Sequence, residues 1–342
     1  MTTSPLILLD PHPRSLNLIF TPEDRARLDA MGRVIWYEGD VAPEPHIDEH
    51  LPEAVAIIGQ TDLPAERLKR ATKLRAIMNV EGNFQPNIDY EICQQRGIHV
   101  LACAPAFAPA VAEMSLLMAL ALARRVVEHD VAFRGGREAY SAASNQGCFL
   151  LRGRTVGLLG CGNVGQSLLP LLRPFGGNIL VHDPWLHDNV LRDMETTPVD
   201  LETLLDQAEV LFLLAAVTTE NQHLIGAREL ALLPDNAIVV LTSRAGIVDF
   251  PALLEAANSG RIRAAIDVFP EEPVPVDDPV RRTKNVILSG HRAGGVQATY
   301  HRVGEMVVDD LEMILAGLPP RRMQSATPEV VARYRSPAIA AR

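Results

Sequence analysis

Apolar residues in the first third of the chain come in short runs that alternate with polar stretches of helical periodicity. We predict a strand at each run, namely Leu6–Leu9, Val34–Tyr37, Ala54–Ile58, Leu74–Val80 and His99–Ala102. Strands that alternate with helices are typical of βαβ units, whose crossover helix returns the chain to a parallel sheet. The pattern therefore predicts an α/β domain in this part of the chain.

A second series of the same kind covers Thr155–Leu288, after a long helical stretch at Ala110–Asp130. A polar stretch, Arg134–Gly153, separates the two, and a last helical pattern covers His301–Leu315. Because the second series lies in the middle of the chain, we expect the last helix to return to the first domain. This predicts a substrate domain from residues 1–106 and 296–342 and a nucleotide domain from residues 107–295, with a ligand cleft between them.

The second series opens with a glycine pattern that favours a dinucleotide. The strand Thr155–Leu159 leads into Gly160-x-Gly162-x-x-Gly165 and then into an apolar helix. Gly160 permits the tight turn, Gly162 lets the backbone approach a pyrophosphate, and Gly165 lets the helix pack on the strand. The helix N-terminus offers N–H groups to the phosphates. A glycine-rich turn without a ligand would show the same residues, so the pattern alone is weak.

Asp183 strengthens the dinucleotide hypothesis, because it ends the next predicted strand, in "NILVHDPW". A carboxylate at this interval after the glycines can accept both ribose hydroxyls. It would also repel the 2′-phosphate of NADP, and the neighbouring His182 and His187 are mostly neutral at pH 7. We therefore predict NAD as the cofactor.

Composition excludes several classes of protein. The chain has 342 residues, is 47% hydrophobic and has a formal net charge of −10, which argues against nucleic acid and anionic membranes as partners. Its four cysteines form no C-x-x-C pair and are expected as reduced thiols in a cytoplasmic protein. The apolar run Met114–Ala123 is shorter than the roughly 20 residues of a membrane span, so we predict a buried helix there. The N-terminal residues show no signal sequence.

Arg244 follows the apolar stretch that starts at Val239, where a buried strand is predicted. Ligands of parallel sheets bind at the carboxyl ends of the strands, so a guanidinium at this point suits an anionic ligand. The alternative is an ion pair with a surface carboxylate, because most charges at strand ends are solvated.

Together with the glycine pattern, several segments resemble the D-isomer-specific 2-hydroxyacid dehydrogenases over roughly Leu74–Leu318. These segments are "NIDY" (Asn87–Tyr90), "AVAEMSLLMALALARR" (Ala110–Arg125), "TTENQHLI" (Thr218–Ile225), "TSRAGIVD" (Thr242–Asp249), "RAAIDVFPEEP" (Arg263–Pro273) and "SGHRAGG" (Ser289–Gly295). The resemblance implies two Rossmann-like domains, a flavodoxin-like substrate domain and a central doubly wound NAD-binding domain. It also implies NAD and a small 2-keto or 2-hydroxy acid as ligands.

The resemblance implies an active site of Arg244, Glu272 and His291. A planar guanidinium can grip a carboxylate and the adjacent carbonyl oxygen at two points. His291 would give a proton to that oxygen in reduction and take it back in oxidation. Glu272 would bond the far ring nitrogen and stabilise the imidazolium. Besides the three glycines and Asp183, the residues expected at the cofactor are Asn163, Val164, Ala215, Thr242, Arg244, Asp267 and His291.

The chain departs from the family pattern at several positions. "LAAVTT" at Leu214–Thr219 replaces H-x-P-x-T, and Leu241, Ala245 and Gly290 stand where Asn, Gly and Pro are usual. The largest departure is "VEGNFQPNID", in which Gly82 is kept but Phe84 and Pro86 replace a glycine and an aspartate. We expect Gly82, Asn83 and Phe84 to bind the substrate. We favour a Phe84 ring that points into the cleft, over one that packs in the domain core.

Two other motifs yield weaker hypotheses. His46 and His50 are four residues apart in "PHIDEH", but the surrounding prolines argue against a helix start before His46, so we predict an acidic loop without metal. The segment Pro319–Arg342 carries five arginines and one glutamate, and we expect it to lie over an acidic neighbour.

Three functions remain open. The first is an NAD-dependent dehydrogenase or 2-keto acid reductase. The second is a binding protein that senses NAD(H) on the same fold, as the co-repressors of the family do, and the third is a formate dehydrogenase-like enzyme, whose pattern has Gln in place of Glu272. The apolar helix near residues 110–127 is longer than a seam within one domain needs, so we also expect a homodimer that buries it.

Overall fold

The computed structural model describes residues 4–39, 41–218 and 220–333. These residues form two compact units, which we describe separately. The first unit holds the described residues up to Phe107 and from Gly295 onward, and the second holds Ala108–Gly294. Two parts of the predictions lie outside the described residues, namely Thr219 and the last nine residues, 334–342, of the arginine-rich tail.

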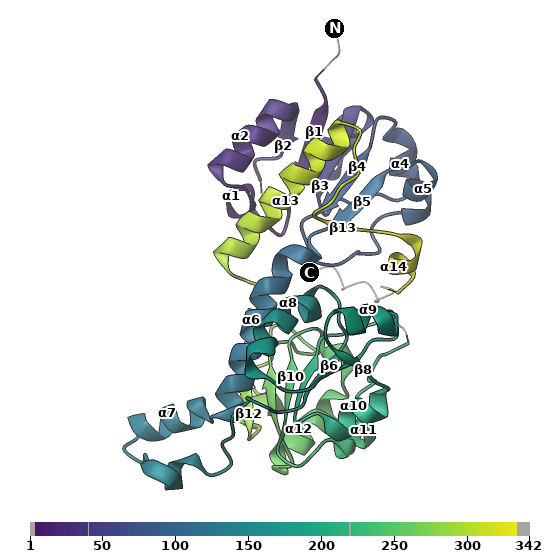
Figure 1. The fold of residues 1–342 in the computed structure, drawn as a ribbon. Helices are drawn as coiled ribbons and strands as arrows, with labels where there is room; N and C mark the ends of the chain where they lie inside the picture. The colour runs from purple at the N-terminus through teal and green to yellow at the C-terminus, as the bar shows by residue number, and fades with distance from the viewer. Residues whose placement is uncertain (1–3, 40, 219, 334–342) are drawn as a thin grey trace. The chain divides into compact units, whose positions relative to one another are not determined.

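The first unit contains a six-stranded sheet in the order β13-β5-β4-β3-β1-β2 (Figure 1). Its strands are β1 (Leu6–Asp10), β2 (Arg33–Trp36), β3 (Ala54–Gly59), β4 (Ala76–Asn79), β5 (His99–Ala102) and β13 (Gln324–Ser325). All pairs are parallel except β13 with β5. The order of β1 to β5 is the flavodoxin-like one, with its switch point between β1 and β3, as predicted.

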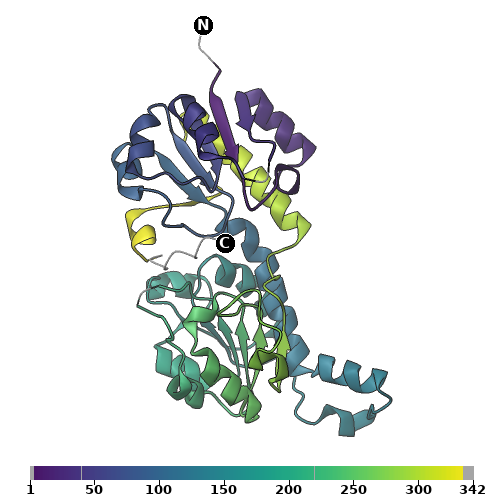
Figure 2. The ribbon, with the colours of Figure 1, turned by 180° about the vertical axis from the view of Figure 1, so that it is seen from behind.

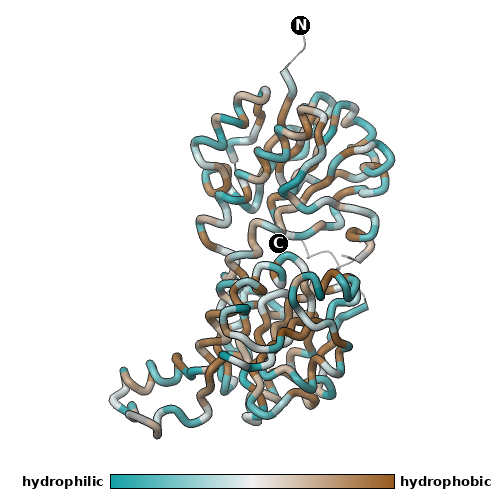
Figure 3. Tube along the Cα trace, viewed as in Figure 1, coloured by the Kyte–Doolittle hydropathy of each residue, from teal (hydrophilic) through white to brown (hydrophobic). Residues whose placement is uncertain are grey.

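Helices cover both faces of this sheet (Figure 1), because β1, β3, β4 and β5 carry apolar side chains on both faces. Figure 3 shows the apolar character of these strands along the Cα trace. One face carries α1 (Leu16–Ile19), α2 (Pro22–Met31) and α13 (Gln297–Leu315). The other face carries α3 (Glu44–His50), α4 (Ala65–Arg70), α5 (Tyr90–Gln95) and the last helix, α14 (Pro328–Arg333).

The prediction of a loop at "PHIDEH" is wrong, because α3 begins before His46. Pro43 occupies the N-cap and Pro45 lies in the first turn, where a helix loses nothing by a missing N–H. The prolines therefore start this helix. The rings of His46 and His50 pack edge to face, with centroids 4.9 Å apart.

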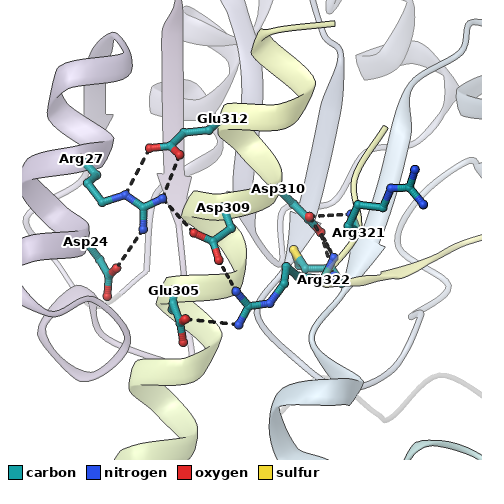
Figure 4. A network of polar contacts seen from close by, with 9 residues as sticks. Asp24, Arg27, Glu305, Asp309, Asp310, Glu312, Arg321 and Arg322 are labelled. Atoms are coloured by element: carbon teal, nitrogen blue, oxygen red, sulfur yellow. Dashed lines mark hydrogen bonds and ion pairs between the residues drawn. The ribbon is translucent and has the colours of Figure 1, made fainter. Parts of the chain in front are cut away.

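Buried Asp310 of α13 fixes the segment that leads into β13 (Figure 4). Its Oδ1 accepts the backbone N–H groups of Arg321 and Arg322 at 2.7 and 2.9 Å, and its Oδ2 accepts that of Met323 at 2.7 Å. Asp309 and Glu312, on the same helix, pair with Arg27 of α2 and hold the pKa of that guanidinium above its ordinary value. The helix is thus joined to α2 on one side and to the C-terminal segment on the other.

The second unit contains a seven-stranded parallel sheet in the order β12-β11-β10-β9-β6-β7-β8. Its strands are β6 (Val156–Leu159), β7 (Ile179–His182), β8 (Thr197–Pro198), β9 (Val210–Leu213), β10 (Ala237–Leu241), β11 (Ile262–Ile266) and β12 (Val286–Leu288). One face carries α6 (Ala104–Ala123), α8 (Asn163–Leu172) and α9 (Asp188–Asp193), and the other α10 (Leu201–Gln207), α11 (Ala227–Leu232) and α12 (Phe250–Asn258). This is the predicted doubly wound arrangement.

The predicted helix Ala110–Asp130 is in fact two helices, α6 and α7 (Val126–Arg134). Arg125, between them, has a left-handed φ of 49°. The break has a physical cause, because partners outside the helix take the last carbonyls of α6: Arg263 donates to Leu122 and the Phe149 amide to Ala123. Figures 1 and 2 show α7 and the turn after it extending away from the rest of the second unit.

By length and composition, α6 would be long and apolar enough to cross a membrane, and half of its most apolar stretch is buried. The buried residues of its second half, which include Met118, Ala119 and Leu122, pack on the sheet of the second unit. That is the environment of a core helix, and such helices pass the same test of length and composition.

Candidate active site

The glycine loop follows β6, an inner strand of the second unit, and its geometry favours glycine at two positions. Gly160 has a φ of +90°, and a Cβ there would lie 2.7 Å from the backbone of Ala215. A Cβ on Gly165 would lie 3.0 Å from the carbonyl oxygen of Gly160. Gly162 differs, because nothing lies within 4 Å of the Cβ position there. The loop therefore leaves space above Gly162, which suits the approach of a pyrophosphate.

Helix α8 begins directly after this space, with Asn163 and Val164 in its first turn. Its N-cap is Gly162, so no cap side chain binds the N–H groups of that turn. The positive end of the helix dipole points to the same place. The residues present therefore fit a dinucleotide phosphate group.

Asp183, at the end of β7, is bound to the glycine loop. Its Oδ2 accepts the Cys161 amide at 2.8 Å, and its Oδ1 accepts the Trp185 amide at 2.9 Å. A carboxylate oxygen can accept more than one hydrogen bond, so both oxygens keep capacity for ribose hydroxyls. Burial and the neighbouring Asp183 raise the pKa of the Cys161 thiol to about 11, which keeps that side chain a neutral packing group.

A cavity of about 710 Å³ lies beside Asp183, and sequence reasoning missed most of its lining. Among its walls are Pro184, Trp185, His187 and Arg192. The signal was available, because Pro184 and Trp185 follow Asp183 directly, at the ligand end of β7, and His187 and Arg192 come soon after them. The Arg192 guanidinium is paired with Asp188 at 3.0 Å, as an (i, i+4) contact on α9.

Glu272 and His291 form a close pair in the second unit. Nδ1 of His291 lies 2.6 Å from Oε2 of Glu272, and Oε1 of the same carboxylate accepts the Phe269 amide at 2.9 Å. The imidazole is 44% exposed and the carboxylate 24%. With Nδ1 held by Glu272, the ring presents Nε2 to a ligand, as a proton donor or acceptor.

Asp267, at the end of β11, positions the backbone around His291. Its carbonyl oxygen accepts the His291 amide at 2.7 Å, and its carboxylate accepts the amides of Arg292 and Ala293, both at 3.1 Å. These bonds hold His291 at a left-handed φ of 48°, which costs a non-glycine residue about 1 kcal/mol or more. We expected Asp267 at the cofactor, and the visible contacts of its buried carboxylate are with this loop.

Arg244 and Thr242 follow β10, the neighbour of β11. The Thr242 hydroxyl is buried and bonded to Ser115 of α6 at 2.8 Å, so the side chain serves packing, and a role at the cofactor would fall to its backbone. Arg244 is exposed, and its Nη1 donates to the Ser243 carbonyl at 2.7 Å. The sheet thus brings Arg244, Asp267 and His291 to the carboxyl ends of neighbouring strands, which is the ligand edge.

A second cavity, of about 420 Å³, adjoins the pair and is lined by both Glu272 and His291. Its walls also include Phe269, Val274 and Leu288, which sequence reasoning did not single out. Their signal is weak, because apolar residues at these positions resemble ordinary core.

The loop Gly82–Phe84, which we predicted to bind the substrate, belongs to the first unit, and the predicted orientation of the Phe84 ring was wrong. The ring is 5% exposed and packs in the core beside α5, where it meets Tyr90 edge to face at 6.3 Å. The physical reason is that the loop follows β4 directly and an apolar ring gains more from the core than from solvent. Any substrate contact of Phe84 is therefore left to its backbone.

Histidine, cysteine and carboxylate side chains are not grouped for metal binding in the part of the chain that the structure describes. No set of three or more such residues lies close enough to hold an ion there.

The chain matches a family model described as "D-isomer specific 2-hydroxyacid dehydrogenase, NAD binding domain" over residues 116–293. Among similar proteins is a glyoxylate reductase of Korarchaeum cryptofilum, 31% identical over 84% of this chain and 87% of the relative. A hydroxypyruvate reductase of Thermotoga maritima is 31% identical over 76% and 85%. The crystal structure of a phosphoglycerate oxidoreductase from Rhizobium etli has a TM-score of 0.86 and 41% identity, covering 94% of this chain and 98% of that one.

Proposed function

Because the chain belongs to the D-isomer specific 2-hydroxyacid dehydrogenases and is an NAD-dependent oxidoreductase, we propose that it interconverts a small 2-keto acid and its D-2-hydroxy acid. In this proposal Arg244, Glu272 and His291 are the catalytic residues. The observation that carries it is the Glu272–His291 contact of 2.6 Å, held at the ligand edge of the sheet by the backbone contacts of Asp267. NAD(H), when bound at the glycine loop, supplies or accepts the hydride.

The roles of the protein groups follow from their chemistry. Arg244 grips the substrate carboxylate and the adjacent carbonyl oxygen, with backbone donors of Gly82, Asn83 and Phe84 sharing the carboxylate. His291 gives a proton from Nε2 to the carbonyl oxygen in reduction and removes it in oxidation. Glu272 keeps the ring oriented and balances the charge of the imidazolium. The oxygens of Asp183 receive the adenosine ribose hydroxyls and disfavour a 2′-phosphate.

Turnover with NADH and a panel of 2-keto acids tests this proposal. The panel holds glyoxylate, hydroxypyruvate and longer 2-keto acids. His291→Ala and Glu272→Gln should each lower kcat by about 10² or more, with the Kd for NADH unchanged. Glu271→Gln is the matched control, because Glu271 is the exposed neighbour of Glu272. Parent-like turnover of His291→Ala would remove His291 from the reaction. A parent that binds NADH but reduces no 2-keto acid would leave the binding protein and the formate dehydrogenase-like enzyme as the functions to consider.

We expected a homodimer through residues 110–127, and we now propose helix α7, which begins at the end of that stretch, as its interface. None of its residues is buried, and it carries four exposed large apolar side chains. They are Val126, Val127, Val131 and Phe133, and the neighbouring segments of the chain add Leu117, Tyr140 and Leu150. Such a patch on one projecting segment is typical of an interface, and a second copy of this chain offers an equally apolar partner. The cytoplasmic location expected from the reduced cysteines remains part of the proposal.

Sedimentation velocity tests the dimer. The parent should sediment as a dimer at micromolar concentration, and the double variant Val131→Glu/Phe133→Glu as a folded monomer. Val276→Glu is the control, since Val276 is 90% exposed but lies in a loop far along the chain from α7. A monomeric parent, or a double variant that stays dimeric, contradicts this interface.

A further inference from the structure

Arg14 lies in the loop after β1, at the switch point of the sheet in the first unit. In open α/β sheets this is the place where ligands bind. Two strands away, Glu81 follows β4 and immediately precedes Gly82, the first residue of the proposed carboxylate loop. The sheet therefore brings a guanidinium and a carboxylate to the edge at which the substrate anion is expected.

Arg14 and Glu81 meet side-on. Nη2 of Arg14 donates to Oε2 of Glu81 at 3.2 Å, and Nε lies 3.0 Å from Oε1. The Nε contact is an ion pair without hydrogen-bond geometry, because the direction of its N–H misses the oxygen. Both side chains are about three-quarters buried, at 25% and 23% exposure, so their charges are less screened than those of a surface pair.

Tyr300, in the first turn of α13, supports this pair. The Arg14 guanidinium lies over its ring at 5.0 Å from the centroid. The same ring meets Phe107 edge to face, with centroids 6.4 Å apart, and Cδ2 of Phe107 lies 3.8 Å from the Cβ position of Gly82. Thus Arg14 contacts Glu81 and Phe107 packs beside Gly82. The ring of Tyr300 contacts both Arg14 and Phe107 and so supports both ends of this arrangement.

We propose that Arg14 is a positioning residue for the substrate carboxylate. In this role Arg14 neutralises the charge of Glu81 and fixes the start of the Gly82–Phe84 loop. The reason is electrostatic. An unpaired carboxylate next to the loop would repel the anionic substrate. When Glu81 is paired with Arg14, the backbone N–H groups of the loop instead dominate the electrostatic field at the substrate carboxylate. The inference rests on the proposed function, since it assumes that the loop binds a carboxylate.

Steady-state kinetics of Arg14→Met, Glu81→Gln and the double variant test this role. Arg14→Met should raise the KM for glyoxylate by about tenfold, with kcat within about twofold and the Kd for NADH unchanged. Glu81→Gln alone should leave KM at or below the parent value. The double variant should regain a KM near that of the parent, because no charge remains to be neutralised. Arg14→Lys, which keeps the charge, should stay within about threefold of the parent.

Salt adds a measurement that a merely structural role would not affect. Higher ionic strength should lower the KM of Arg14→Met more than that of the parent, because it screens the exposed charge of Glu81. A double variant that remains as weak as Arg14→Met would overturn the proposal, because Arg14 would then contact the substrate itself or serve only packing.

Binding of oxamate, a non-reacting analogue of a 2-keto acid, separates this inference from the proposed function. It is measured by calorimetry in the presence of NADH. If the parent turns over no keto acid but the affinities of the variants for oxamate follow the order predicted for KM, the proposed function is rejected and the role of Arg14 stands. If the parent reduces keto acids but the double variant is not rescued, only the role of Arg14 falls. A parent that binds no oxamate overturns both.

Discussion

Two loops that follow central strands, one in each unit, reach a fixed shape by opposite means. The loop after β6 is shaped by glycines, since Gly160 has a positive φ and a Cβ at that position would collide with the backbone of Ala215. The loop after β4 is shaped by side chains: Phe84 is embedded in the core, and Glu81 is paired with Arg14. A phosphate site needs close approach of the backbone, so side chains are excluded from it. The role proposed for the loop after β4, which is to bind a carboxylate, needs only a fixed backbone, and packing can provide that.

Gly160→Val is the most severe way to break this contrast. The added Cβ would collide with the backbone of Ala215, and valine strongly disfavours a φ of +90°. We expect the Kd for NADH to rise at least about 100-fold, measured by fluorescence titration. Circular dichroism serves as the check on folding. Binding that remains near the parent value would mean that the loop adapts and that its glycines do not determine its shape.

Phe84→Ala should act on stability. Truncation of a buried phenylalanine costs about 3–5 kcal/mol, measured as the free energy of unfolding in urea. Trp36 and Trp185 lie one in each unit, so Trp185→Phe leaves a probe for the first unit alone. Val41→Ala is the control, because that side chain is 57% exposed and belongs to the same unit as Phe84.

The kinetics of Phe84→Ala with two keto acids test the position of the ring independently. With the ring in the core, glyoxylate and a bulky 2-keto acid should lose kcat/KM about equally. If only the bulky substrate lost kcat/KM and the free energy of unfolding were unchanged, the Phe84 ring would contact the substrate after all.

Gly82→Ala and Gly162→Ala should have the smallest effects on folding and sharpen the comparison most. A Cβ on Gly82 makes ordinary contacts at 3.8 Å, and one on Gly162 meets nothing within 4 Å. We expect both variants within about 1 kcal/mol of the parent in unfolding free energy. Gly162→Ala should nevertheless weaken NADH by about tenfold, whereas Gly82→Ala leaves the Kd for NADH unchanged. Equal NADH affinities for the two variants would contradict a pyrophosphate at Gly162.

The sequence was most informative where local pattern and tertiary structure agree. The buried strands could be predicted because runs of β-branched and aliphatic residues have few other stable environments. The strands β8 and β13 could not, since two residues carry no periodicity and pairing with a neighbour defines them. The end of α6 was missed for a related reason, because it depends on caps from Arg263 and Phe149, which are remote in sequence.

In the candidate site, the residues of the glycine loop and the segments of Glu272 and His291 could be located from motifs. The burial of Phe84 could not, because a phenylalanine after a strand is compatible with either environment until the helix beside it is known. The hydrogen bonds from the Arg292 and Ala293 amides to Asp267 could not be predicted either, because contacts with backbone amides do not depend on residue type.

The segment that Asp310 binds affects the order in which the two units can fold during synthesis on the ribosome. The second unit is complete when Gly294 has emerged, but the core of the first unit still lacks α13, and its sheet still lacks β13. Domains generally fold as their residues become available, so residues 4–107 cannot complete their core and sheet until α13 and β13 have been made. Until then β5 remains an open edge, of the kind that invites pairing with other chains. Asp310 accepts the amides of Arg321–Met323 and so holds β13 beside β5, which covers that edge.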